Sequence, residues 1–240
     1  MQDRVGGRDV GDVDSWPDTR TLPVLGRPER LPDGIDVGGG SRAVIRVRVL
    51  GKPGILDVPA DLHIRKNALE FLTYLIARGG SVHQDFILED LMPEPSRRKA
   101  VERMHTYTYN LRQVFIRLGG DGSYLKVQQH QYVLDRAGFD VDLWTMLDAV
   151  ADAAAAPEQQ SQVAALRRVV DAYTGPFADG AGYLWLSGYR YLIRREYVDA
   201  VVTLADNLGG PARAVLEEGR RHHPYDERLA AVLKGFTVTR

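Results

Sequence analysis

Residues 96–120 read SRRKAVERMHTYTYNLRQVFIRLGG, and this stretch decides the fold. Ser96 is a suitable N-cap for a helix, and Gly119 and Gly120 supply a stop. Between them, side chains suited to a core recur every three or four positions, as on one face of an α-helix. They are Val101, Met104, Thr108, Leu111, Phe115 and Leu118. The pattern therefore predicts one long amphipathic helix, called the basic helix below.

The outer face of the basic helix is predicted to be cationic and polar. The stretch holds six basic side chains and one acidic one. Roughly opposite the core stripe lie Lys99, Arg103, Thr106, Asn110, Gln113 and Arg117. A helix that enters a DNA major groove needs cations for the phosphates and forked polar groups for the base edges. The alternative is a solvated helix face without a ligand.

The charge of the chain is unevenly distributed. The net charge is −1, but residues 41–136 carry 15 basic and 10 acidic groups, while residues 1–40 and 137–240 each carry an acidic excess of three. The basic helix alone accounts for a surplus of five, equal to that of the whole middle segment. This pattern indicates a local electrostatic footprint on a protein that is not basic overall.

Composition excludes several classes of site. The 240 residues include no cysteine, so disulfides, thiolate metal sites and a cysteine nucleophile are ruled out. No apolar run approaches the roughly 20 residues of a membrane helix, and the first residues lack the apolar region of a signal peptide. The expectation is a cytoplasmic protein without a membrane segment, metal or cofactor.

The segments around the basic helix predict a winged helix-turn-helix over residues 41–136. Residues 1–40 are rich in Gly, Asp and Pro without apolar periodicity, so a disordered tail or linker is expected there. Alternating apolar residues indicate strands, and spaced apolar stripes indicate helices, with Ser81 as an expected N-cap. The expected elements are strands 43–50 and 55–58, helices 65–78 and 81–91, and a hairpin of strands 124–128 and 131–134.

Residues 137–240 are predicted to form an all-α, tetratricopeptide-like domain. Apolar stripes at helical spacing are separated by short polar breaks and by one Gly/Pro loop at 174–182, and paired helices of this kind stack side by side. The expected helices are 141–156, 159–173, 185–208, 211–221 and 226–236. The predicted fold class is therefore mainly α with short β strands, a winged helix-turn-helix followed by a helical domain.

The chain resembles the Streptomyces antibiotic regulatory protein family over residues 43–236. In that family an OmpR-type winged helix precedes a bacterial transcriptional activation domain. The resemblance rests on the order and spacing of several segments. They are VRVLGKPGI at 47–55, RKNALEFLTYLIARGGSVHQDFILEDLMPE at 65–94, HTYTYNLRQVF at 105–115, FDVDLW at 139–144, YTGPF at 173–177 and PYDER at 224–228.

The resemblance implies a cytoplasmic, actinobacterial transcriptional activator that binds double-stranded DNA. The basic helix would enter the major groove, and the hairpin wing would approach the backbone or the minor groove. The helical domain would contact RNA polymerase, another protein or a second protomer in a homodimer. The chain departs from the family in three places: the wing residues 129–133 contain no Gly or Arg, Tyr107 and Tyr109 replace smaller or basic residues, and the chain stops soon after Phe236.

Nine residues are the predicted DNA contacts. Three adjacent cations at the start of the basic helix suit phosphates, because the N-terminal amides of a helix also attract anions. Cations at this end oppose the helix dipole and reduce stability, so their placement favours a functional role. The next four suit base edges, and the last two suit the backbone, although a cation near a helix C-terminus is also favourable by itself. They are, in that order, Arg97, Arg98 and Lys99; Arg103, Thr106, Asn110 and Gln113; Arg117 and Lys126.

The remaining polar and aromatic residues receive structural interpretations. The tyrosines at 107, 109 and 124 could stack on bases or touch phosphates, but packing against the first helix or the wing is favoured. His105 could reach DNA, although a surface histidine without a ligand is the favoured interpretation. His222 and His223 have no partner at metal-ligand spacing, and Asp140 and Asp142 are expected to cap the next helix. No catalytic motif is present, so an enzyme is not expected. The alternative function is a protein-interaction module whose winged helix has lost strong DNA binding.

Overall fold

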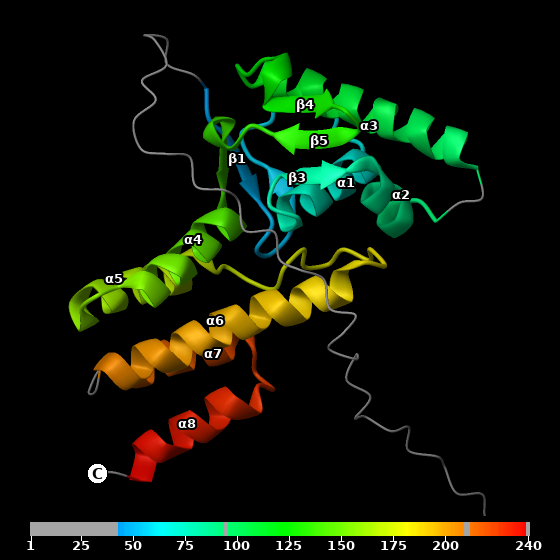
Figure 1. Ribbon diagram of the computed structural model, residues 1–240. Helices are drawn as coiled ribbons and strands as arrows, with labels where there is room; N and C mark the ends of the chain where they lie inside the picture. Colours follow the sequence, from blue (N-terminus) through cyan, green and yellow to red (C-terminus); the bar gives the residue numbers. More distant parts are fainter. Residues whose placement is uncertain (1–42, 94–95, 209–211, 239–240) are drawn as a thin grey trace, which may run out of the picture.

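The computed structural model describes residues 43–93, 96–208 and 212–238, so the expected tail at 1–40 lies outside the described residues. Figure 1 shows two parts: residues 43–141, with two small sheets around three helices, and residues 142–238, a row of helices. We call them the N-terminal half and the helical half. The expected fold class is confirmed, a winged helix-turn-helix with short strands followed by a tetratricopeptide-like helical part.

The first sheet has the order β2-β1-β6. β1 (Ile45–Arg48) pairs antiparallel with β2 (Gly54–Ile55) and parallel with β6 (Phe139–Val141). Ile45 and Val47 are buried because alternate strand residues face the same side. The predicted domain boundary, after residue 136, precedes a strand that belongs to the first sheet.

Three helices form the core of the N-terminal half: α1 (Lys66–Ala77), α2 (Gln84–Leu91) and α3 (Arg97–Arg117). α3 is the basic helix. As expected, Ser96 caps it, accepting a hydrogen bond from the Lys99 N–H at 3.5 Å. At its other end Gly119 has φ 86° and the Gly120 N–H donates to the Phe115 carbonyl at 2.8 Å, which closes the helix in the left-handed conformation that glycine adopts easily.

The second sheet corrects one expectation. Its order is β3-β5-β4, from β3 (Ser81–His83), β5 (Gln131–Leu134) and β4 (Leu125–Gln128). Ser81 is therefore a strand residue and not the N-cap of α2. That role belongs to His83, whose Nδ1 accepts from the Asp85 N–H at 3.3 Å. The physical reason is that Val82 is buried by pairing with Tyr132 of the wing, a long-range contact that overrides local helix preference.

The helical half contains five helices within its described residues. They are α4 (Asp142–Ala155), α5 (Gln159–Ala172), α6 (Leu186–Leu208), α7 (Ala212–His222) and α8 (Glu227–Val238). Each packs on the next, so the helices form a row (Figure 1). Two 3-10 turns, Gly122–Tyr124 and Arg136–Gly138, flank the wing.

Asp142 ties the two halves together. Its buried carboxylate accepts hydrogen bonds from the N–H groups of Val49 (2.9 Å), Leu50 (3.0 Å) and Leu143 (2.8 Å). Burial raises the pKa of this carboxyl to about 6, although the three N–H groups favour its charged form.

Asp140 and Asp142 were expected to cap the following helix, but the N-cap of α4 is Val141, without a side-chain hydrogen bond, and Asp140 pairs with Arg48. Asp142 is the first residue of α4, and because β6 pairs beside β1 its carboxylate reaches the N–H groups that follow β1.

The Gly/Pro loop and two tryptophans reinforce this junction. The Ala178 N–H donates to the Val49 carbonyl at 2.7 Å, and the Gly51 N–H donates to the Pro176 carbonyl at 3.0 Å. Trp144 of α4 donates its indole N–H to the Ile76 carbonyl of α1 at 3.0 Å, and Trp185 donates to Glu70 of α1 at 3.2 Å. The loop at 174–182 therefore crosses the end of β1 and is fixed there by hydrogen bonds.

A histidine in the helical half makes stability depend on pH. The His223 ring lies 2.8 Å from the Tyr173 hydroxyl, within an aromatic cluster that includes Tyr197 and His222. Burial and the positive charge of Arg194 lower the pKa of His223 from 6.5 to about 4, against the opposing charge of Asp226. The folded state therefore holds the neutral ring, and this contribution to stability is complete above pH 6.5 and lost as pH falls toward 4.

We expect protonation of His223 to lower the free energy of unfolding by about 1–2 kcal/mol between pH 7.5 and pH 5. The measurement is urea unfolding of the wild type and of His223→Gln at both pH values, because glutamine keeps a hydrogen-bonding side chain but does not titrate. The loss on acidification should be smaller in H223Q by that amount. An identical loss in both proteins would show that His223 is not the group responsible.

Candidate nucleic-acid interface

α3 lies along the edge of the N-terminal half remote from α6, α7 and α8 (Figure 1). Its inner face follows the predicted stripe, with Met104, Thr108, Leu111 and Phe115 buried and Val101 and Leu118 half-buried. The buried Thr108 hydroxyl is satisfied by donating to the Met104 carbonyl at 2.8 Å. One long face of the helix is therefore held by the core, and the opposite face carries most of the exposed side chains.

The three cations at the start of α3 are all exposed. Arg97 donates to Asp85 at 2.6 Å, and its hydrogen bond holds the pKa of that carboxyl below the ordinary value. Arg98 is 86% exposed, with Glu102 one turn away at 3.7 Å. Lys99 is exposed as well. Exposed pairs of this kind contribute little to stability, so these cations can turn to a phosphate at small cost.

Of the four predicted base-contacting residues, three are exposed and one is half-buried. Arg103, Thr106 and Gln113 are exposed, and the Thr106 hydroxyl donates to the Glu102 carbonyl at 3.0 Å. Asn110 is half-buried, and its amide oxygen accepts the Arg65 N–H at 3.2 Å. Asn110 thus supports the segment that leads into α1.

The two predicted backbone contacts lie on different elements, α3 and the wing. Arg117, in the last turn of α3, donates to Asp61 at 2.7 Å, and this hydrogen bond lowers the pKa of that carboxyl. Lys126 is exposed on β4 of the wing. Arg117 therefore has an internal partner in the free protein, and Lys126 is open to solvent.

The structure adds two cations that the sequence reasoning missed. Arg65 and Lys66 at the start of α1 are exposed and line a shallow hollow with Asn67, Arg103, Thr106 and Tyr107. They could have been found from the sequence, because Arg65 and Lys66 are adjacent cations at the start of a predicted helix, as Arg97, Arg98 and Lys99 are at the start of α3. Together with Arg103 they extend the positive surface from α3 onto α1.

The tyrosines follow expectation with one exception. Tyr107 packs against Phe71 and its hydroxyl accepts from Asn67 at 3.1 Å, while Tyr124 is fully buried. Tyr109 is 66% exposed, contrary to the expected inward packing. It lies seven residues after Glu102, two helical turns along the same outer face, so an aromatic ring stands among the polar groups. His105 is exposed, as expected.

The wing turn is a tight one made without glycine. β4 and β5 are joined by Gln129 and His130, whose φ angles are 48° and 63°. Two-residue hairpin turns place both residues in the left-handed region, where Asn-Gly is preferred. Arg112 of α3 anchors the base of the hairpin by donating from Nε (3.0 Å) and a terminal nitrogen (2.8 Å) to the Leu125 carbonyl.

Replacing Gln129 by Asn and His130 by Gly should therefore stabilise the protein by about 1 kcal/mol, because the strain of two non-glycine residues in the left-handed region is relieved. Urea unfolding at pH 7.5 measures the change. Gln128→Asn, one residue earlier and in an extended strand, is the matched control and should give no gain. A double variant that is no more stable than the wild type contradicts the expectation.

The arrangement suits a polyanion more than a small substrate. Cations of α3 and α1 meet around one shallow hollow with polar side chains between them, and Lys126 of the wing is exposed as well. Among the described residues no cluster of three or more His, Asp or Glu could hold a metal ion. The described helices also include none long and apolar enough to cross a membrane.

Comparison with known proteins supports the fold. No protein-family profile matches the chain, and no curated protein matches its sequence. Among solved structures, the chain is similar to Mycobacterium tuberculosis EmbR in complex with a low-affinity phosphopeptide, with a TM-score of 0.61 and 21% sequence identity. The match covers 79% of this chain and 53% of EmbR, so the chain spans about half the length of that protein.

Proposed function

We propose that this chain is a cytoplasmic, DNA-binding transcription regulator of the Streptomyces antibiotic regulatory protein type. Residues 41–136 form the OmpR-type DNA-binding domain, and residues 137–240 form the bacterial transcriptional activation domain. In this proposal α3 occupies the major groove of double-stranded DNA. The helical half contacts RNA polymerase, another protein or a second copy of the chain.

The observation that carries the proposal is the exposed face of α3. Arg98, Lys99 and Arg103 project from a helix whose opposite face is buried, and α3 is 21 residues long, ample to follow a groove. Arg65 at the start of α1 lies beside Arg103, and Lys126 of the wing is a further exposed cation. The likeness to EmbR supports the assignment through the fold.

A second candidate is a protein-interaction module with weak DNA binding. It is favoured by the ion pairs of Arg97 with Asp85 and of Arg117 with Asp61, which occupy two predicted phosphate contacts, and by a wing whose strands carry the single cation Lys126. In this alternative the helical half binds its partner in full without DNA.

Selection of duplex fragments from the source genome by the full chain, read by sequencing, tests the proposal. We expect enrichment of a shared sequence element, and an affinity for it that falls steeply with salt because bound phosphates release counterions. The absence of duplex retention at low salt would falsify the proposal and favour the interaction module. Retention without a shared element would reduce the proposal to non-specific DNA binding and overturn sequence-specific regulation.

A further inference from the structure

Two histidines meet where the wing turn reaches the start of α2. His130, in the turn between β4 and β5, lies edge-on to His83, the last residue of β3, with ring centroids 6.3 Å apart. The Gln84 N–H donates to the His130 carbonyl at 2.8 Å, so the backbone holds the two segments together. The His83 side chain is 40% exposed, and His130 is exposed as well. Both imidazole rings are therefore open to solvent on a backbone that is held in place.

One carboxylate connects this pair of rings to the basic helix. His83 Nδ1 lies 3.5 Å from one oxygen of Asp85, and the other oxygen accepts a hydrogen bond from Arg97 of α3 at 2.6 Å. Glu89, one turn after Asp85 on α2, lines a hollow with Asp85 and Arg97. β5 presents the neutral Gln131 opposite His83. The wing turn and the start of α3 thus belong to one cluster of charged and titratable groups.

The net charge of this cluster changes sign when the two rings are protonated. With both rings neutral, Arg97 is outweighed by Asp85 and Glu89, and the one net negative charge repels a phosphate. With both rings protonated, the cluster carries one net positive charge, which attracts a phosphate. Imidazole is the side chain whose charge ordinarily changes between pH 5 and pH 8. The attraction of the cluster for phosphate should therefore increase as the pH falls through this range.

Protonation of His83 also reverses a hydrogen bond. The neutral Nδ1 accepts the Asp85 N–H at 3.3 Å as the cap of α2, so this nitrogen carries no proton in that state. A proton added there makes Nδ1 a donor, and the nearby Asp85 carboxylate is its acceptor. Asp85 is then shared between His83 and Arg97. Because the Arg97 side chain is 68% exposed, its guanidinium can turn from Asp85 to a phosphate.

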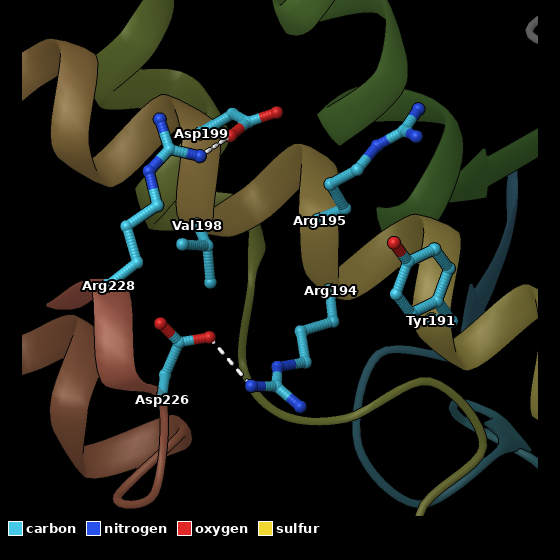
Figure 2. Close-up of a pocket in the computed structure, with 7 residues that line it drawn as sticks. All are labelled: Tyr191, Arg194, Arg195, Val198, Asp199, Asp226 and Arg228. Carbon is cyan, nitrogen blue, oxygen red and sulfur yellow. Dashed lines mark hydrogen bonds and ion pairs between the residues drawn. The ribbon is translucent and has the colours of Figure 1, made fainter. Parts of the chain in front are cut away.

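The charged hollow on the helical half differs from this cluster. Figure 2 shows its two ion pairs, which join Arg194 to Asp226 and Arg228 to Asp199. The described residues that line it include no histidine, so its charge stays constant between pH 6 and pH 8. These pairs link α6 to the start of α8 and are part of the fold.

We propose that His83, His130 and Arg97 form a binding site for one phosphate of the DNA backbone, and that this site takes up protons as it binds. Two protonated rings 6.3 Å apart repel each other, and an anion beside them offsets that repulsion, so phosphate binding and protonation favour each other. The site deepens the proposed DNA-binding function and rests on it. It gives the wing a phosphate contact in addition to Lys126 of β4.

The affinity of the full chain for a fluorescein-labelled, 30-base-pair duplex of mixed sequence, measured at pH 6.0 and pH 8.0, tests the site. A duplex of mixed sequence is sufficient because phosphate contacts carry little sequence information. We expect the wild type to bind about tenfold more tightly at pH 6.0, because charge-assisted hydrogen bonds to the phosphate form at that pH. A plot of log affinity against log salt concentration should also be steeper at pH 6.0 by about 0.9, the contribution of one phosphate.

A double variant, His83→Asn with His130→Gln, removes both titrating rings. Asparagine is a good N-cap for α2, and Gln129 in the same turn shows that glutamine accepts a left-handed backbone there. In this variant the affinities at the two pH values should differ by less than about twofold. His63→Gln, at an exposed histidine before α1, is the matched control and should keep the full gain at pH 6.0.

Circular dichroism at both pH values checks that each variant is folded. An equal gain at pH 6.0 in the double variant and in the wild type would overturn the proposal. A gain that disappears in His105→Gln alone would overturn it too, because the added charge would then come from the outer face of α3. A wild type that binds the duplex equally at both pH values refutes this site and leaves the DNA-binding proposal intact, whereas a wild type that binds at neither pH refutes both.

Discussion

Replacing Arg97, Arg98 and Arg103 together by alanine is expected to lower the affinity for duplex DNA on the order of 100-fold at 0.1 M salt. All three side chains are exposed on α3, and each is a proposed contact to a phosphate or a base edge. The loss should affect specific and non-specific duplexes, because phosphate contacts carry little sequence information. A plot of log affinity against log salt concentration should also become less steep by about 1.8, because Arg97 and Arg98 are the two proposed phosphate contacts among the three.

The matched control removes three arginines from the helical half, with Arg167, Arg213 and Arg220 replaced by alanine. These side chains are exposed, and the net charge changes by the same amount. Their loss should alter affinity by less than about threefold, because long-range attraction is largely screened at this ionic strength. Equal losses in the two triple variants would mean that overall charge, and not the surface of α3, governs binding. The ion pair of Arg97 with Asp85 adds one refinement: Asp85→Asn should increase affinity modestly by releasing that cation.

Replacing Asp142 by alanine is expected to lower the free energy of unfolding by about 3–5 kcal/mol. The substitution removes the acceptor of three backbone N–H groups, those of Val49, Leu50 and Leu143, in a buried site. Each buried donor left without a partner costs about 1–3 kcal/mol. Part of this cost is offset by removing the carboxylate itself. Its pKa is raised to about 6, so keeping it charged in the folded protein at neutral pH costs free energy.

Asp140 provides a control two residues away. Its carboxylate pairs with Arg48 at 3.2 Å, and both side chains are partly exposed, so Asp140→Ala should cost less than about 1 kcal/mol. Urea unfolding followed by circular dichroism and by tryptophan fluorescence measures both variants, since Trp144 and Trp185 sit at the junction. Equal stability of the two variants would show that the bonds of Asp142 do not hold the junction.

The sequence predicted the basic helix well because its pattern is long and is decided locally. The apolar spacing repeats over about six turns, so a single residue that departs from it does not change the prediction. The predicted cap at Ser96 and the predicted stop at Gly119 lie at the observed ends. The third strand of the wing sheet was missed for the opposite reason. Ser81–His83 has only three residues, and its strand conformation depends on a partner about 50 residues later. A short segment carries too little periodicity to show such pairing.

The chemistry of single side chains was less predictable than their positions. Asn110 occupies the expected helix face, but its amide bonds the backbone of Arg65 because the segment before α1 packs beside it. Tyr109 was expected inside and lies outside, since the core places of α3 are filled by its neighbours Thr108 and Leu111. Asp142 was expected to cap the following helix, but it is the first residue of that helix, and its carboxylate bonds to the residues after β1, which lie over 90 residues away in the sequence. Such tertiary partners leave no local pattern.

The hydrogen-bonded junction between the two halves has a consequence for how a bound partner would be oriented relative to DNA. Asp142, Trp144 and the loop at 174–182 leave the helical half no free hinge at the end of β1. A protein held by that half in the proposed function would therefore be presented at one fixed angle around the DNA axis. Because a duplex turns once in about 10.5 base pairs, inserting about five between two binding sites would place the partner on the opposite side of the helix. Helical phase, and not distance alone, would then govern cooperation between neighbouring complexes.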